Sequence, residues 1–276
     1  ELEALLAGGE DPDPEPTDPE GWTLHYATNF ANLDGWTVKN GQTQSNDNSA
    51  NMSANCVPGP NGLDIWGKRQ ASNGKPYTSG EIENHGAGVV PNYFRAEVVG
   101  TAMDDRGLWP CLLWFRPQAG GDGSNGEIDL MEIMNGNFTG NQRRVAVTMH
   151  NEYGSSQDSW KGPIFWQDLT NIDPTAEHKY TLEKTPGQIK VWMDDDEGKA
   201  VYFGTTTEVR SHLPQNGVTS PKIWWARIME ASNRTWYPRI TLQIGAGSSV
   251  QVVPEPESTW QQSKMNVRSL KLWVPA

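Results

Sequence analysis

Short stretches rich in β-forming residues recur along the chain from Trp22 onward. Two of them, RVAVTMH at 144–150 and IKVWMD at 189–194, alternate apolar and polar residues, as a strand with one buried face does. Asn-Gly and Pro-Gly pairs punctuate these stretches, and no long segment has the helical period. We therefore expect an all-β fold of two packed antiparallel sheets, which can curve and leave a groove on the concave face.

The first twenty residues differ in composition from the rest. ELEALLAGG looks like the last turns of a helix with a glycine stop, and EDPDPEPTDPE then alternates acid and proline, as a stiff, solvated spacer does. We expect residues 1–20 to be an acidic, proline-rich linker or tail that belongs to a larger chain or particle. Residues 21–276 are expected to form one domain.

One predicted strand, GEIDLMEIM at 126–134, carries three acids among five apolar residues. Alternation places Glu127 and Asp129 on one face, but it places Glu132 in the core, where an unpaired carboxylate costs several kcal/mol. A β-bulge at Leu130–Met131 adds one residue and returns Glu132 to the face of the other two acids. We therefore predict a bulged strand with its three acids in a row, while one of the bulge residues enters the core.

A row of three carboxylates is electrostatically costly, which indicates a chemical use. Crowded like charges raise at least one pKa, and a general acid that works near neutral pH needs a raised pKa. Retaining glycosidases use two carboxyl groups about 5–5.5 Å apart, one as the nucleophile and one as the proton donor. By themselves, the three acids are equally compatible with an acidic surface strand or part of a cation site.

Charge and composition narrow the choice of partners. The net charge of −12 argues against nucleic acid, because phosphate binding needs clustered Lys and Arg. No apolar run reaches the roughly 18 residues of a membrane span. The 13 Trp and 28 Gly suit many short strands and turns and do not suit a helical bundle. Cys56 and Cys111 permit one disulfide, and the sequence leaves open whether they pair.

The flanks of the acids extend the pattern over most of residues 22–276. The segments that carry it are FANLDGW (30–36), YTSGEIEN (77–84), NYFRAEV (92–98), GLWPCLLWF (107–115), NGEIDLMEIMNG (125–136), VAVTMHN (145–151), EHKYTLEKTPGQIKVWMDD (177–195) and MNVRSLKLWV (265–274). With these segments in this order, the chain resembles glycoside hydrolase family 16, whose members share a curved jelly-roll sandwich and the bulged motif E-x-D-x-x-E.

The resemblance implies a role for each residue at a matching position. Glu127 would be the nucleophile, Glu132 the acid/base and Asp129 the assisting residue in retaining, endo-acting hydrolysis of a β-linked polysaccharide. His150 would lie on the neighbouring strand, near the acids. β-1,3-glucan is the implied substrate because it is the family's commonest one. Such an enzyme would be secreted or extracellular, and it could be attached to a cell surface or to a phage particle.

Tryptophans are the main candidates for sugar binding. The resemblance favours groove positions for Trp109 and Trp114, but their spacing of five residues requires a bend in the strand. Trp160 follows in a later loop and could stack on a sugar ring as the wall of a subsite. Most of the other tryptophans are expected to pack in the core or at sheet edges.

Two departures from the family pattern concern substrate and metal. Members that cut β-1,3-glucan tend to carry Asn-x-Ala-x-Gly-Gly-x-Trp on a late strand, whereas this chain has LQIGAGSSV, with Gln243. Arg234 and Arg239 precede it and either recognise another sugar or shield a sheet edge. The closing strand of the family usually carries an Asp that helps to hold a structural calcium, but here Arg268 stands in its place. A cation beside a calcium site is unfavourable, so we expect no metal and no cofactor.

Three other functions remain open. The first is a galactan hydrolase acting on agar or carrageenan, although a sulfated galactan needs a basic groove and the net charge of −12 weighs against one. The second is a transglycosylase of the same family. The third is a non-catalytic carbohydrate-binding module or adhesin, because sandwich folds are reused for binding alone. Such a module would have no use for crowded carboxylates, and the polysaccharide is the expected partner in every case.

Overall fold

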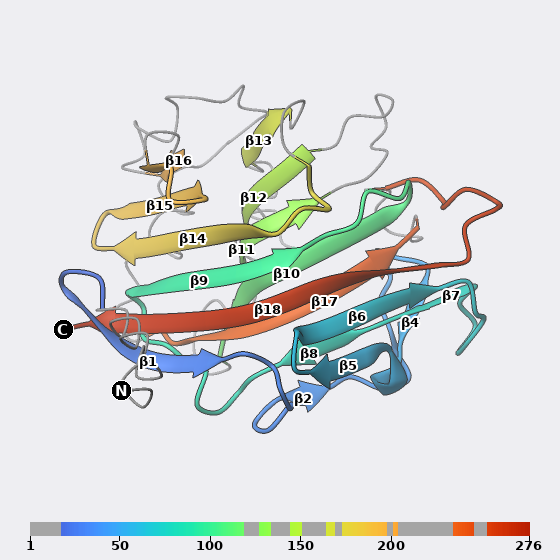
Figure 1. The fold of residues 1–276 in the computed structure, drawn as a ribbon, viewed down its shortest axis with the longest axis horizontal. Coiled ribbons are helices and arrows are strands. Elements are labelled where there is room, and N and C mark those ends of the chain that lie inside the picture. Colours follow the sequence, from blue (N-terminus) through green and yellow to red (C-terminus); the bar gives the residue numbers. More distant parts are fainter. Residues whose placement is uncertain are drawn as a thin grey trace, which may run out of the picture.

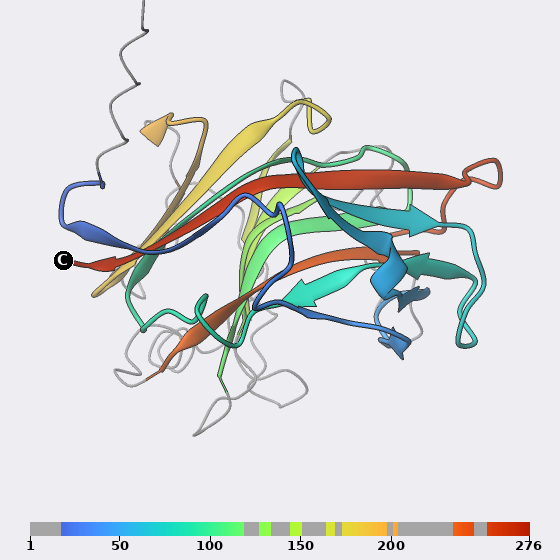
Figure 2. The ribbon, with the colours of Figure 1, turned by 60° about the horizontal axis from the view of Figure 1, so that its bottom comes forward.

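The structure is a computed structural model that describes residues 18–118, 127–133, 144–150, 164–168, 173–197, 201–203, 234–245 and 253–276. In these segments the chain forms eighteen strands, one short 3-10 helix at Ser53–Asn55 and no α-helix. Two sheets lie face to face as layers (Figures 1 and 2), so the predicted curved jelly-roll sandwich is confirmed. No helix of the described residues is long and apolar enough to cross a membrane.

The larger sheet contains eleven of the described strands. Along it the order is β16-β15-β14-β9-β18-β6-β7-β4-β3, while β1 pairs with β18 and β5 pairs with β6. All of its pairs are antiparallel except β4 with β7. The bounds are β1 Trp22–Thr28, β3 Gln42–Thr43, β4 Ser49–Asn51, β5 Cys56–Gly59, β6 Gly62–Lys68, β7 Tyr77–Ser79, β9 Phe94–Thr101, β14 His178–Thr185, β15 Gln188–Met193, β16 Val201–Phe203 and β18 Gln262–Pro275.

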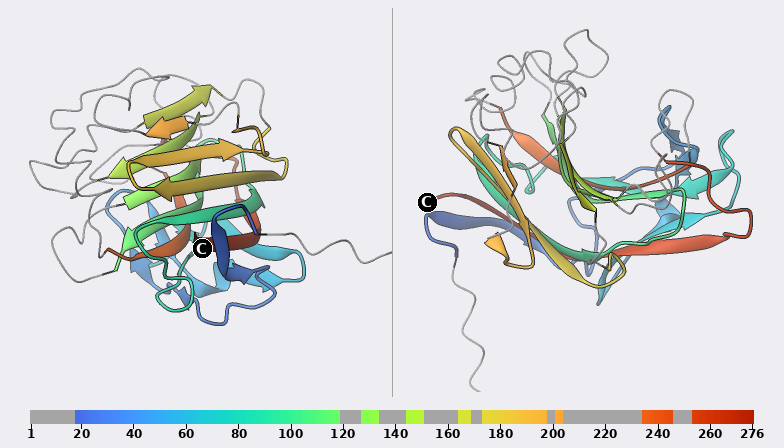
Figure 3. Two further views of the ribbon diagram at one scale, coloured as in Figure 1. Left: turned by 90° about the vertical axis from the view of Figure 1, so that its left-hand side faces the viewer. Right: turned by 90° about the horizontal axis from the view of Figure 1, so that it is seen from above.

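The smaller sheet contains seven of the described strands and carries the predicted acids. Its order is β13-β12-β11-β10-β17-β8-β2, with antiparallel pairing throughout. The bounds are β2 Thr37–Val38, β8 Glu81–Glu83, β10 Leu108–Pro117, β11 Glu127–Ile133, β12 Arg144–His150, β13 Ile164–Asp168 and β17 Trp236–Ile244. Both sheets are bent, and the seven-stranded sheet lies on the inside of the bend (Figure 3). The face of the seven-stranded sheet that points away from the larger sheet is therefore concave.

Local sequence explains several of these elements. β12 occupies 144–150 as alternation predicts, and β1 begins at Trp22. The β14–β15 hairpin closes with the Thr185–Gln188 pair, which leaves Pro186 and Gly187 as its two turn residues. Gly187 has a φ of 78°, a value that glycine adopts at no steric cost. Alternating side chains of both sheets then meet in one core, where each fully buried Leu or Ile contributes about 1.5–3 kcal/mol.

The two cysteines lie on different sheets and both are free thiols. Cys56 on β5 belongs to the hydrophobic core, where burial raises its pKa to about 12. Cys111 on β10 is also buried but lies outside that core cluster. The disulfide that the sequence left open is therefore not formed.

One lysine is fully buried between the layers, and it makes the stability of the protein depend on pH. Lys184 Nζ donates hydrogen bonds of 2.7 Å to the backbone oxygen and to Oδ1 of Asn92. Burial, and secondarily the charge of Arg234, lowers the pKa of Lys184 to about 7. The unfolded lysine titrates near pH 10.4, so the unfolded chain binds more protons between these two values. The free energy of unfolding should therefore rise with pH in this window.

We expect wild type, measured against a Lys184→Met variant, to gain about 2 kcal/mol of unfolding free energy between pH 7 and pH 9. Urea denaturation of both proteins at the two pH values measures this difference, and groups common to both cancel. If the difference in unfolding free energy between the two proteins is the same at both pH values, the lowered pKa of Lys184 is contradicted.

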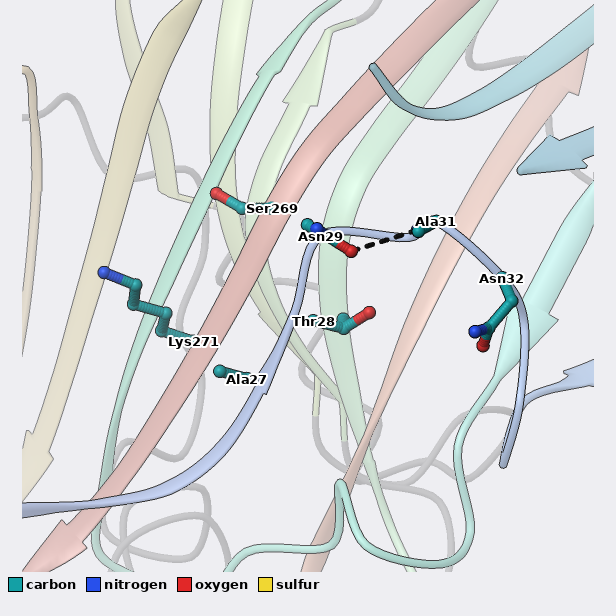
Figure 4. A pocket seen from close by; sticks show the side chains of 7 residues that line it. All are labelled: Ala27, Thr28, Asn29, Ala31, Asn32, Ser269 and Lys271. Atoms are coloured by element: carbon teal, nitrogen blue, oxygen red, sulfur yellow. Dashed lines mark hydrogen bonds between the residues drawn. The ribbon is translucent and has the colours of Figure 1, made fainter. Parts of the chain in front are cut away.

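A surface depression lies on the eleven-stranded sheet and is drawn in Figure 4. Ser269 and Lys271 of β18 line it together with Asn29, which follows β1. β18 alternates here, because Leu270 and Leu272 belong to the core, so Ser269 and Lys271 face away from the acids. This depression is not part of the site built below.

Candidate active site

β11 contains the predicted bulge. Asp129 pairs with Thr148 of β12 and Glu132 pairs with Ala146, so three steps along β11 match two steps along β12. The extra residue lies at Leu130–Met131, and both of these side chains are fully buried in the core. One bulge residue was expected in the core and both are there. Glu132 is consequently returned to the face that carries the other two acids.

β10 contains a second bulge, which aligns its aromatic residues with the acids. Cys111 pairs with Thr241 of β17 and Trp114 pairs with Arg239, so again three steps match two. The two residues between them, 112 and 113, are both leucines that are fully buried in the core. Trp109 and Trp114 therefore share one face despite their spacing of five. The bend that this spacing required is present.

Contacts between β10 and β11 show that these side chains share the concave face with the acids. Trp109 Nε1 donates a hydrogen bond of 2.8 Å to Glu132 Oε1. Arg116 Nε donates to Glu127 Oε2 at 3.2 Å. The sulfur of Cys111 and a carboxylate oxygen from each of Asp129 and Glu132 all lie within 4.8 Å of one another.

The three acids are nearly removed from water. Their exposed fractions are 9% for Glu127, 2% for Asp129 and 6% for Glu132. Burial raises the pKa of Asp129 well above its ordinary value, and the charges of the two glutamates raise it further. Burial and the two neighbouring glutamates therefore favour the protonated form of Asp129, and a protonated carboxyl group donates a hydrogen bond. Burial also raises the pKa of the Cys111 thiol, with Glu132 as the next cause, so the thiol is neutral.

A buried ion-pair network continues the concave face beyond the tryptophans. Arg239 of β17 forms ion pairs with Glu81 and Glu83 of β8. Its guanidinium lies 3.9 Å from the ring centroid of Trp114, so it makes a cation–π contact with the indole. Glu81 also accepts hydrogen bonds of 2.9 Å from the side-chain amides of Gln44 and Asn51.

The four other predicted residues lie in different places. Gln243 pairs with Trp109 on the neighbouring strand and joins the site from β17. The guanidinium of Arg234 lies 5.4 Å from the ring of Trp236, which is fully buried in the core, and the sugar-binding role of Arg234 stays a prediction. His150 pairs with Glu127 across β11 and β12, on the adjacent strand as expected. Trp160 lies outside the described residues.

The sequence reasoning did not identify four of the residues that complete this face. Cys111 lies two residues after Trp109, and Arg116 lies two residues after Trp114. Glu81 and Glu83 alternate in the same way around an isoleucine. Period-two alternation from an assigned groove residue is the signal that would have found Cys111 and Arg116.

Sequence comparisons find nothing similar: no family model matches the chain, and no curated protein matches it. Solved structures do match. The catalytic domain of a laminarinase from Thermotoga maritima has a TM-score of 0.69 and 15% identity, covering 93% of this chain and 100% of its own. A non-specific endo-β-1,3(4)-glucanase from glycoside hydrolase family 16 has a TM-score of 0.67 and 17% identity, covering 95% of both chains. A laminarinase from Rhodothermus marinus has a TM-score of 0.66 and 20% identity, covering 92% of this chain and 98% of its own.

These similarities extend over nearly the whole length of each structure. The fold that the sequence motifs indicated, the curved sandwich of glycoside hydrolase family 16, is therefore confirmed.

Proposed function

We propose that the protein is a retaining, endo-acting glycoside hydrolase that cleaves a β-linked polysaccharide, with β-1,3-glucan as the substrate. The observation that carries the proposal is the bulge in β11, because it brings Glu127, Asp129 and Glu132 to one buried, concave face. Two tryptophans lie on the same face, and rings of this kind stack on sugars. The names of the similar structures, laminarinases and endo-glucanases, support the choice of glucan.

The reaction proceeds in two displacements. A Glu127 carboxylate oxygen bonds to the anomeric carbon while the glycosidic C–O bond breaks, and Glu132 gives its proton to the leaving oxygen. Water then attacks the same carbon and loses a proton to Glu132, which releases Glu127 as a carboxylate. Asp129 lies between the two glutamates in the chain, and its raised pKa favours a protonated carboxyl that adds a hydrogen-bond donor without adding a charge.

The charges on the concave face favour a neutral glucan over a sulfated galactan. Among the described residues there, Arg116 pairs with Glu127 and Arg239 pairs with Glu81 and Glu83. Lys39 is also paired with Glu83. Cations that are already neutralised by carboxylates attract sulfate groups weakly, so carrageenan is the less suitable substrate.

Release of reducing ends from laminarin, lichenan, agarose and carrageenan tests the proposal. We expect release from laminarin with a rapid fall in viscosity, as an endo-acting enzyme produces. Release from agarose or carrageenan alone would identify a galactanase. Binding to laminarin without any release would support the carbohydrate-binding module.

The indole of Trp109 should tune the acid/base. A Trp109→Phe variant keeps an aromatic ring but removes the N–H that donates to Glu132 Oε1. A carboxylate that loses a hydrogen-bond donor has a higher pKa, and the loss of one such hydrogen bond raises the pKa by up to about one unit. We expect the alkaline limb of the kcat/KM profile on laminarin to move to higher pH by about that amount. An unchanged limb would show that Trp109 does not act on Glu132.

We infer that no structural calcium binds at the closing strand. The residue where the family usually has Asp is Arg268, and its Nη1 donates hydrogen bonds of 2.9 Å to both carboxylate oxygens of Glu177. A guanidinium that occupies both oxygens leaves no anionic pair for a hard cation, so the residues present do not fit calcium.

A chelator should therefore leave the melting temperature unchanged, and calorimetry with and without EDTA measures it. A loss of about 5 °C that added calcium restores would contradict the inference, because a ligand that binds the native state raises its melting temperature.

Localisation and attachment follow from the substrate and the spacer. A polysaccharide is too large to enter a cell, so we infer that the protein acts outside it. The acidic, proline-rich residues 1–20 are proposed to join this domain to a larger chain or particle.

A further inference from the structure

The two ends of the acid row have unlike neighbours. At one end the guanidinium of Arg116 contacts Glu127, and at the other the neutral indole N–H of Trp109 contacts Glu132. A retaining mechanism requires the same inequality, because the nucleophile starts as an anion and the acid/base starts protonated. Buried carboxylates this close cannot all be ionised. Some feature of the site must therefore decide which one keeps the charge.

Arg116 is placed by β10 to act on Glu127. It follows Trp114 by two residues on the concave face and lies one step beyond the Phe115–Ile128 pair, which puts it opposite Glu127. Nε of Arg116 lies 3.2 Å from Glu127 Oε2, and the guanidinium carbon lies 5.7 Å from the ring centroid of Trp114. Contacts on both sides fix the orientation of the guanidinium.

We propose that Arg116 is a positioning residue whose guanidinium keeps the Glu127 carboxylate ionised and thereby fixes it as the nucleophile. The inference rests on the proposed function and deepens it. Nothing in the family motif E-x-D-x-x-E identifies Arg116, which lies outside that motif on the neighbouring strand.

Electrostatics around the row support this direction. Among the described residues, Arg116 is the one cation that acts on the pKa of Asp129, and it lowers that pKa while burial and both glutamates raise it. Opposite unit charges in contact at a partly buried site attract each other more strongly than they do in bulk water. The proton shared by the row is therefore displaced from the Arg116 end towards Asp129 and Glu132.

The other titratable groups around Glu127 do not cancel this effect. Burial, and next the charge of Glu83, raises the pKa of Tyr237, so its phenol is neutral and leaves the Arg116 charge intact. The thiol of Cys111 is neutral as well. The described groups that act on or contact Glu127 are Arg116 and Cys111 from β10, Asp129 and Glu132 from β11, and Tyr237 from β17. The backbone of His150 on β12 is paired with that of Glu127.

The first test compares Arg116→Gln and Arg116→Lys with Arg268→Gln, which also removes an arginine–carboxylate pair but on the other sheet. The acid limb of kcat/KM on laminarin reports ionisation of the nucleophile. We expect it to move up by about one pH unit in Arg116→Gln, with an approximately tenfold loss of rate below the limb. Arg116→Lys should restore most of the wild-type pH profile, and Arg268→Gln should have the same pH profile as wild type. A fall in rate at every pH without movement of the limb would overturn the proposal.

The second test reads the carboxyl group directly. Glutamate labelled with 13C at the side-chain carboxyl is titrated by NMR in wild type and Arg116→Gln, and Glu127→Gln assigns the signal. We expect Glu127 to titrate below Glu132 in wild type and to move up in Arg116→Gln. An unmoved Glu127 signal in a variant that melts like wild type overturns the role of Arg116. Absence of turnover by wild type overturns the proposed function instead, so the two failures are distinguishable.

Discussion

A Glu127→Gln variant is expected to lose about 10,000-fold or more of kcat on laminarin while it still binds laminari-oligosaccharides. The amide has the same shape as the carboxylate but is not a nucleophile, so no glycosyl-enzyme forms. Reducing-end release measures the loss of turnover, and calorimetric titration with an oligosaccharide measures retained binding. Arg116 loses its anionic partner in this variant, which should raise the dissociation constant only modestly.

A matched control is Glu183→Gln, because Glu183 also pairs with an arginine, Arg95, but on the eleven-stranded sheet. It should retain wild-type turnover. Turnover that persists in Glu127→Gln would remove Glu127 from the reaction, and with it the two-displacement mechanism.

Glu132→Ala should show the second-largest loss, and the loss should depend on the leaving group. Hydrolysis of laminarin should fall by about 100- to 10,000-fold, which is the usual contribution of a general acid. An aryl glycoside with an acidic phenol needs no proton to depart, so its first displacement should remain fast in the variant. Azide, which needs no general base, should then accelerate the second displacement and yield a glycosyl azide.

Stopped-flow release of the phenol and mass spectrometry of the products measure both steps. An equal loss on laminarin and on the aryl glycoside would mean that Glu132 does not protonate the leaving group. Wild type supplies the reference, since azide should not accelerate it.

The bulge in β11 was predictable because plain alternation leads to a physical conflict there. A regular strand would place Glu132 among apolar side chains, and one extra residue at Leu130–Met131 removes that cost. Both neighbours are apolar, so they enter the core without penalty. A conflict between charge and burial is thus enough to locate a bulge.

The bulge in β10 could not be located in the same way. The residues there, 112 and 113, are leucines, which satisfy the core in either register and leave no unpaired charge as a signal. Only the spacing of Trp109 and Trp114 pointed to a bend, and that argument required both rings to be on the concave face. The sequence therefore indicated a bend in β10 without its position.

The partners of Arg239 depend on pairing between distant segments. Arg239 meets Glu81 and Glu83 because β17 pairs with β8, and these strands are more than 150 residues apart in sequence. No local pattern predicts such a meeting. The sequence therefore did not predict the carboxylate partners of Arg239, and its sugar-binding role stays a prediction.

The most direct measurement is a crystal structure of the protein after reaction with a 2-deoxy-2-fluoro β-1,3-glucoside, which traps a covalent glycosyl-enzyme. We predict a bond from the sugar to a Glu127 carboxylate oxygen, the Glu132 carboxyl on the same side of the sheet, and Leu130 and Met131 both inside the sandwich. A sugar on another residue, or a regular β11 ladder with Glu132 pointing into the interior, would contradict this result.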